Sequence, residues 1–187
     1  MLSFRIAMLA LLVTLAGDVA TAAGRSASLY ASAGVSSSVS MLGRYTNEGF
    51  GGMMAAGVRP FESSRDVVLT ASLHYDRFAN EVSGMGSFSF VRFGLGVRLY
   101  LDPARSSRAY LLLNVGPARV KVDPNSGFPP FNDAGRSTTN LFGAGGIGYE
   151  LGVGKPVGVF MQAELVDILD TLFGDYRFVR LSFGLRL

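Results

Sequence analysis

The last eleven residues, 177–187, alternate between two kinds of side chain. Successive side chains of a β-strand point to opposite faces of its sheet, so this alternation predicts a strand with two unlike faces. The apolar face carries Val179, Leu181, Phe183, Leu185 and Leu187. The other face is small, polar or cationic and carries Arg180, Ser182, Gly184 and Arg186. A fold that uses this strand must cover its apolar face with something other than water.

Seven earlier segments repeat this period of two and predict seven more strands. In one of them, Val120 and Val122 have the opposite parity to the apolar residues that precede Pro117. Proline has no N–H to give to a sheet, so we predict a bulge at Pro117 that turns both valines to the apolar face. The seven segments lie near residues 28–41, 53–59, 67–78, 88–101, 109–122, 139–153 and 157–166.

The composition is too apolar for an ordinary soluble domain. Hydrophobic residues make up 49% of the chain and charged residues 17%, whereas soluble domains carry about a quarter charged residues. Beyond residue 22 no stretch approaches the ~18 uninterrupted apolar residues of a membrane-spanning helix. Apolar strand faces that contact lipid would reconcile the two facts. The absence of cysteine excludes disulfide and thiolate sites, and a net charge of only +3 without a basic stripe argues against nucleic acid.

Residues 1–22 have the form of a secretory signal peptide. Arg5 precedes an apolar run at 6–15, and Ala20, Thr21 and Ala22 supply small residues for cleavage. The alternative is an N-terminal membrane anchor, but the run is shorter than the roughly 20 residues that span a bilayer. We expect a signal peptide at 1–22 and one barrel domain at 23–187.

The connections between the predicted strands alternate in length. Three are shorter, at 60–66, 102–108 and 154–156, and four are mostly longer and polar or glycine-rich, at 42–52, 79–86, 123–138 and 167–175. Short periplasmic turns, longer external loops and an even strand number are typical of bacterial outer-membrane barrels, and closure leaves no unpaired sheet edge in lipid. We therefore predict an all-β fold, an eight-stranded antiparallel up-and-down transmembrane β-barrel with both termini periplasmic.

At this point the chain resembles the small eight-stranded outer-membrane proteins, namely the OmpA-like and OmpX-like barrels and their opacity-type relatives. The apolar positions Val179, Leu181, Phe183, Leu185 and Leu187 resemble that family's C-terminal assembly signal, although the family usually ends on phenylalanine. The resemblance implies assembly by periplasmic chaperones and the barrel-insertion machinery. It also implies contact with outer-membrane lipid and lipopolysaccharide, and we expect a monomer.

Charged side chains share the parity that would face the interior of such a barrel. An eight-stranded barrel is just wide enough for side chains to fill it, and buried charges need partners. Pairing Val157 with Leu187 would place Glu164 opposite Arg180. We predict a luminal ion-pair network that plugs the interior, with a proton relay or narrow ion path as the alternative reading. Its members are Arg92, Arg98, Glu150, Gln162, Glu164, Arg180 and Arg186.

Aromatic residues lie near the ends of the predicted strands, where outer-membrane barrels carry aromatic girdles. We predict a girdle, although the parity of Tyr110, Tyr176 and Phe178 would also let them cap the interior. The candidates are Tyr75, Phe78, Phe88, Tyr100, Tyr110, Tyr176 and Phe178.

The sole histidine, His74, shares a face with Ser72 and Asp76. Some small outer-membrane barrels are lipid A acyl hydrolases or palmitoyl transferases that use histidine, serine and an acid, so a lipid A-modifying enzyme using His74 is the alternative function. Same-face residues at a spacing of two lie about 6–7 Å apart along a strand, which is too far for a direct catalytic triad without a neighbouring strand. No metal-ligand spacing occurs, and Gly143, Gly145 and Gly148 lie within a strand rather than before a helix, so we predict no cofactor.

The loop at 123–138 carries Phe128, Pro129, Pro130 and Phe131, which form a candidate external contact site. Packing of these residues onto the barrel rim is an equal alternative. A soluble lipocalin-like barrel is the rival architecture, but its wet face would then be rich in Gly, Ala and Ser and poor in Lys. The leading hypothesis is a non-enzymatic outer-membrane protein that serves envelope integrity or surface interaction.

Overall fold

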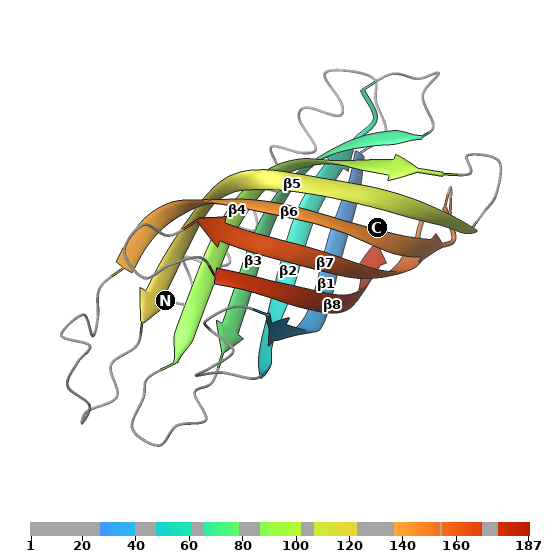
Figure 1. Ribbon diagram of the computed structural model, residues 1–187. Coiled ribbons are helices and arrows are strands. Elements are labelled where there is room, and N and C mark those ends of the chain that lie inside the picture. The colour runs from blue at the N-terminus through green and yellow to red at the C-terminus, as the bar shows by residue number, and fades with distance from the viewer. Residues whose placement is uncertain are drawn as a thin grey trace, which may run out of the picture.

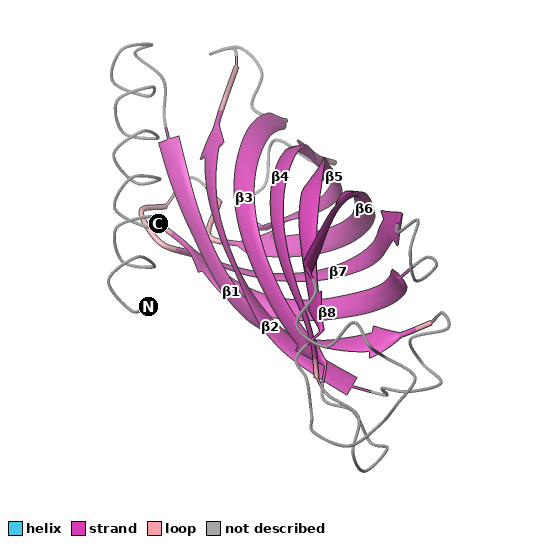
Figure 2. Cartoon of the chain, turned by 90° about the vertical axis from the view of Figure 1, so that its left-hand side faces the viewer, coloured by secondary structure: helices cyan, strands magenta, loops and turns pink. Residues whose placement is uncertain are grey.

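The computed structural model describes residues 27–39, 48–60, 66–78, 87–101, 107–122, 137–153, 155–169 and 176–187. Each described strand pairs antiparallel with its neighbours in sequence, and β1 pairs with β8 to close the barrel (Figures 1 and 2). The predicted fold class is confirmed. The strands are β1 (Ala27–Ser38), β2 (Glu48–Val58), β3 (Val67–Phe78), β4 (Phe88–Tyr100), β5 (Ser107–Val122), β6 (Ser137–Leu151), β7 (Gly158–Leu169) and β8 (Tyr176–Arg186).

The barrel has two ends, which we name by what lies there. At the terminus end β1 begins and β8 finishes, and at the loop end β1 finishes and β8 begins. The predicted signal peptide at 1–22 and the predicted contact site Phe128, Pro129, Pro130 and Phe131 lie outside the described residues. Within the described ranges no helix is long and apolar enough to cross a membrane.

The two faces of the barrel wall have the opposite chemistry to those of a soluble protein. Outward side chains at mid-strand are apolar and exposed, as at Leu95 (59%), Leu113 (58%) and Ile147 (63%). Inward side chains include charges without solvent contact, such as Arg92 (0%) and Glu150 (0%). The alternation read from the sequence therefore divides an apolar exterior from an interior that holds the charges.

The predicted bulge at Pro117 is wrong. β5 pairs with β4 in one register on both sides of the proline, from Phe90↔Val120 to Leu95↔Val115, and its register with β6 is also unbroken. Val120 consequently points inward with 2% exposure, while Arg119 faces outward. The pairing with β4 lapses only next to Pro117, because a missing N–H removes one hydrogen bond and does not require an extra residue.

A small inward residue makes room for a large one on the adjacent strand. A Cβ added at Gly148 in β6 would lie 2.2 Å from Cζ of Tyr110, its partner in β5. The Tyr110 ring is fully buried and donates its hydroxyl to Gln162. Glycine at 148 is thus required by the close approach of a ring whose position is fixed at its far end.

We expect Gly148→Ala to destabilise the barrel by about 1–3 kcal/mol, because the ring must move from a packed site. The matched control is Gly143→Ala in the same strand, where an added Cβ would meet nothing within 4 Å. Urea unfolding of the two refolded variants, followed by far-UV circular dichroism, measures both changes in stability. Equal stability of the two variants would contradict this packing account.

Candidate functional site inside the barrel

A buried ion cluster lies between the middle of the barrel and the loop end. Asp76 on β3 accepts a hydrogen bond from Arg92 Nη2 on β4 at 2.7 Å, and Arg180 Nε on β8 lies 3.6 Å from its other oxygen. All three side chains have no solvent contact. Ser36 also donates to Asp76 at 3.3 Å. One carboxylate therefore serves two buried guanidinium groups, and we call Ser36, Asp76, Arg92 and Arg180 the Asp76 cluster.

His74 lies against this cluster, and its hydrogen bonds fix its chemistry. Its Nδ1 is 3.0 Å from Arg180 Nη1. Because guanidinium nitrogens only donate, we assign Nδ1 as the acceptor and place the ring proton on Nε2. Nε2 lies 3.0 Å from Ser72 Oγ and 3.3 Å from Asn114 Nδ2. In this tautomer Nε2 donates to the serine, has no lone pair to accept the serine proton, and makes no hydrogen bond with the Asn114 nitrogen, which is also a donor. We call Ser72, His74 and Asn114 the His74 cluster.

The hydroxyl of Ser72 already donates one hydrogen bond and accepts two in this arrangement. Its hydroxyl accepts from Asn114 Nδ2 at 2.8 Å and from His74, and it donates to the Gly94 carbonyl at 3.3 Å. Ser72 and His74 touch because their side chains reach across the strand repeat, but His74 and Asp76 share no hydrogen bond among the described contacts, so the three residues do not form a direct triad. The hydrogen bond between Ser72 and His74 also runs in the opposite direction to that of a nucleophilic serine and its base, in which the histidine accepts the serine proton.

A second ion cluster lies at the terminus end. Arg186 Nε donates to Glu150 Oε1 at 2.5 Å, and Tyr100 donates its hydroxyl to Oε2 at 2.5 Å. Arg186 Nη2 also donates to the Gly152 and Lys155 carbonyls. We call Tyr100, Glu150 and Arg186 the Glu150 cluster. Its charge-assisted bonds tie β4, β6 and β8 together across the interior.

Arg98 lies near the terminus end of β4 and has no carboxylate contact among those the structure describes. Its Nη2 donates to Gln162 Oε1 at 3.2 Å, and its guanidinium stands 4.0–4.9 Å from the ring centroids of Tyr30, Tyr110 and Phe160. Such cation–π contacts stabilise a desolvated guanidinium. This aromatic box was missed by sequence reasoning, although all three rings have inward parity in the pattern.

The seven interior residues predicted from the sequence thus do not form a single network but contact different partners. Glu164 lies opposite Arg180 in the β7–β8 register, and its Oε2 has no hydrogen-bond partner among the described residues. Sequence reasoning missed Asp76 as the counterion of Arg92 and Arg180. The signal was available in its inward parity on β3, two residues from His74, which pairs directly with Arg92.

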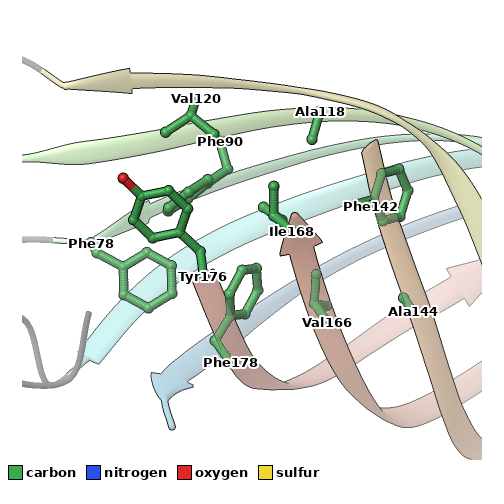
Figure 3. Close-up of a cluster of buried hydrophobic side chains, with 10 residues drawn as sticks. All are labelled: Phe78, Phe90, Ala118, Val120, Phe142, Ala144, Val166, Ile168, Tyr176 and Phe178. Carbon is green, nitrogen blue, oxygen red and sulfur yellow. The ribbon is translucent and has the colours of Figure 1, made fainter. Parts of the chain in front are cut away.

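The loop end of the interior is apolar, which corrects the expectation of aromatic girdles. Of the predicted girdle, Tyr75 faces outward with 38% exposure, whereas Phe78 is fully buried inside; Phe178 is also fully buried inside, in agreement with the alternative that its parity allowed. Among the described residues, aromatic and aliphatic side chains fill the interior at this end of the barrel. Figure 3 shows the residues gathered there, which we call the loop-end cluster: Phe78, Phe90, Ala118, Val120, Phe142, Ala144, Val166, Ile168, Tyr176 and Phe178.

The predicted assembly-signal residues lie on the outer face of β8. Leu181, Phe183, Leu185 and Leu187 are 48–60% exposed, and β8 pairs with both β7 and β1. Among the described residues no group of three histidine, cysteine, aspartate or glutamate side chains could hold a metal ion.

A closed eight-stranded barrel with an apolar exterior and a filled, charged interior is the architecture of small transmembrane barrels. The structure of Neisserial surface protein A (NspA) matches with a TM-score of 0.67 and 20% identity, covering 86% of this chain and 96% of that one. The expected resemblance to small outer-membrane barrels is therefore confirmed at the level of the fold.

Two further structures match over similar spans. The N-terminal β-barrel domain of Pseudomonas aeruginosa OprF gives a TM-score of 0.49 and 16% identity, covering 86% of this chain and 97% of that one. Ail, the attachment invasion locus protein of Yersinia pestis, gives 0.46 and 17%, covering 87% and 97%. No family model matches the chain, and no curated protein sequence matches it.

Proposed function

We propose that this protein is a non-enzymatic bacterial outer-membrane barrel with a plugged interior, acting in envelope integrity or surface interaction through its loops. The observation that carries the proposal is the inverted wall, with exposed apolar side chains outside and ion clusters inside. An exposed apolar band of this extent would be insoluble in water and is suited to acyl chains. The fold shared with a neisserial surface protein is a supporting observation.

The interior supports a plug rather than a channel. The Asp76, His74 and Glu150 clusters fill its middle and terminus end, and the loop-end cluster fills its other mouth with rings. An ion entering from the loop end would have to pass residues such as Phe78, Phe90 and Ile168, which have no solvent contact. The proposed plug consists of Asp76 together with Arg92, Arg98, Glu150, Gln162, Glu164, Arg180 and Arg186.

Two experiments test this proposal. The folded protein should fractionate with the outer membrane and migrate differently on a detergent gel before and after boiling. Inserted into a planar lipid bilayer, it should give no steady single-channel current. A soluble periplasmic product would overturn the location, and regular current steps would overturn the plug.

We extend the proposal to orientation and assembly. With residues 1–22 removed as a signal peptide, both barrel termini would lie in the periplasm and the loop end outside. Val179, Leu181, Phe183, Leu185 and Leu187 would then form the signal read by the insertion machinery after periplasmic chaperones deliver the chain. Phe128, Pro129, Pro130 and Phe131 would lie in an external loop that is available to an extracellular partner.

The outer rim at the loop end suits contact with lipopolysaccharide. Arg77 on β3 and Arg119 on β5 face outward there and donate to the neutral hydroxyls of Ser87 and Ser137 at 3.1 and 2.9 Å. Among the described acidic residues on the outer face, Glu48 at the same end of β2 is the nearest to Arg77 in the strand register. Guanidinium groups whose present partners are neutral can form bidentate hydrogen bonds with lipid phosphates.

We expect the double substitution Arg77→Gln and Arg119→Gln to reduce the gain in thermal stability that lipopolysaccharide gives in vesicles. The matched control neutralises Asp167 and Arg177, an outward pair already joined at 2.6 Å, as Asp167→Asn with Arg177→Gln. The control should keep the full gain. Equal gains in both double variants would exclude the rim as a phosphate contact.

The lipid A-modifying alternative depends on His74. The tautomer assigned above opposes proton transfer from Ser72, and His74 is 1% exposed within the interior. We therefore expect the lipid A of cells carrying His74→Ala to have the same mass spectrum as that of wild-type cells. A difference in lipid A acylation between the variant and wild-type cells would favour the enzyme.

A further inference from the structure

A small cavity lies in the interior between the His74 cluster and Arg98. Its volume is about 20 Å³, and its polar lining consists of Thr70, Ser72, Arg98, Asn114, Gln162 and Glu164. A buried water requires roughly 10–15 Å³ of such space and two to four polar partners. The cavity is therefore large enough for one water molecule and too small for an organic ligand.

Three buried polar atoms of this lining have no hydrogen-bond partner within the described part of the chain. They are Arg98 Nη1, Asn114 Oδ1 and Glu164 Oε2, and their side chains are 4%, 6% and 2% exposed. Ser72 and the Asn114 nitrogen bond each other, and Gln162 Oε1 accepts from Arg98 and Tyr110. These three atoms without partners present one donor and two acceptors, beside the hydroxyl of Thr70.

We infer that this cavity is a binding site for a single structural water molecule. The water would accept from Arg98 Nη1 and donate to Asn114 Oδ1 and Glu164 Oε2, which uses both of its hydrogens and one lone pair. A metal cation is disfavoured by the adjacent guanidinium, and an anion by the adjacent carboxylate. A neutral molecule that both donates and accepts matches the lining in charge and in hydrogen-bonding capacity.

This water joins polar groups that otherwise remain separate. On one side, Asn114 leads through Ser72 and His74 to Arg180 and the Asp76 cluster. On the other, Arg98 leads to Gln162 and Tyr110. With this water the two groups form one hydrogen-bonded network that runs from Tyr110 and Gln162 to the Asp76 cluster. The inference concerns the interior alone and stands whether or not the barrel conducts ions.

Solution NMR of the folded barrel in detergent micelles tests the site directly. We expect a long-lived water to give nuclear Overhauser contacts to the Asn114 side-chain amide protons, with a sign that separates them from chemical exchange. Absence of these contacts in wild-type protein, with the Asn114 amide assigned, would overturn the inference.

Two isosteric variants supply an independent readout. Ala55 on β2 lines the cavity, and Ala55→Val and Ala55→Thr fill it with side chains of the same shape. Threonine brings a hydroxyl that can replace the water, whereas valine leaves the three atoms without partners. We expect the valine variant to unfold at lower urea concentration than both wild type and the threonine variant. A valine variant as stable as wild type and more stable than the threonine variant would identify a dry cavity and overturn the inference.

Discussion

Asp76→Asn is expected to destabilise the barrel by about 3–5 kcal/mol, because it leaves two desolvated guanidinium groups without their counterion. Asp76 is the carboxylate that contacts both Arg92 and Arg180, and all three side chains lack solvent contact. Asparagine keeps the shape and can still accept one hydrogen bond, so the loss reports charge rather than volume. Reversible urea unfolding in phospholipid vesicles measures the change in the free energy of unfolding.

The control for this substitution is the same change at Asp167. Asp167 bonds Arg177 at 2.6 Å, but the two side chains are 33% and 48% exposed at the outer surface. Exposed ion pairs contribute about 0–1 kcal/mol, so Asp167→Asn should have little effect. Comparable losses at the two positions would contradict the assignment of Asp76 as the central counterion of the interior.

Leu113→Arg is expected to destabilise the protein in a bilayer by about 2–4 kcal/mol, the cost of placing arginine on the lipid face at the midplane. Leu113 lies near the middle of β5, faces outward and is 58% exposed. In a water-soluble protein an arginine at such an exposed position would cost little. The same unfolding experiment in vesicles measures the effect.

Thr139→Arg is the matched control, since Thr139 faces outward at the loop end of β6. Near the interface the expected cost falls to about 0–1 kcal/mol. We therefore predict that the cost of an outward arginine depends on its depth in the bilayer. If both arginines cost the same small amount, the outer face would be in water.

The strands could be predicted from the sequence because their period of two does not depend on distant contacts. The alternation at 177–187 and at 88–101 follows β8 and β4 to within about a residue. The phase of β5 beyond Pro117 was misread because valines were assumed to face lipid. Val120 instead contributes to an apolar mouth inside the barrel, and residue type alone does not separate these two apolar environments.

The interior could be predicted only in outline. Inward parity identifies which charges are buried, and the β7–β8 hairpin gives Glu164 opposite Arg180. Contacts across the lumen, such as Asp76 with Arg180, depend on how strand stagger brings distant strands to one level. The aromatic box around Arg98 has the same origin, so neither could be derived from the pairing of neighbouring strands.

In the proposed arrangement the apolar face of the barrel contacts lipid and the charged face is enclosed. Because the chain has no cysteine, single cysteines can carry spin labels at outward Leu95, Leu113 and Leu181 and at inward Ser72 and Ser182. In vesicles, electron paramagnetic resonance should show the outward labels relaxed strongly by oxygen and weakly by a water-soluble nickel chelate, and the inward labels reached by neither. Outward labels relaxed mainly by the nickel chelate would contradict the account.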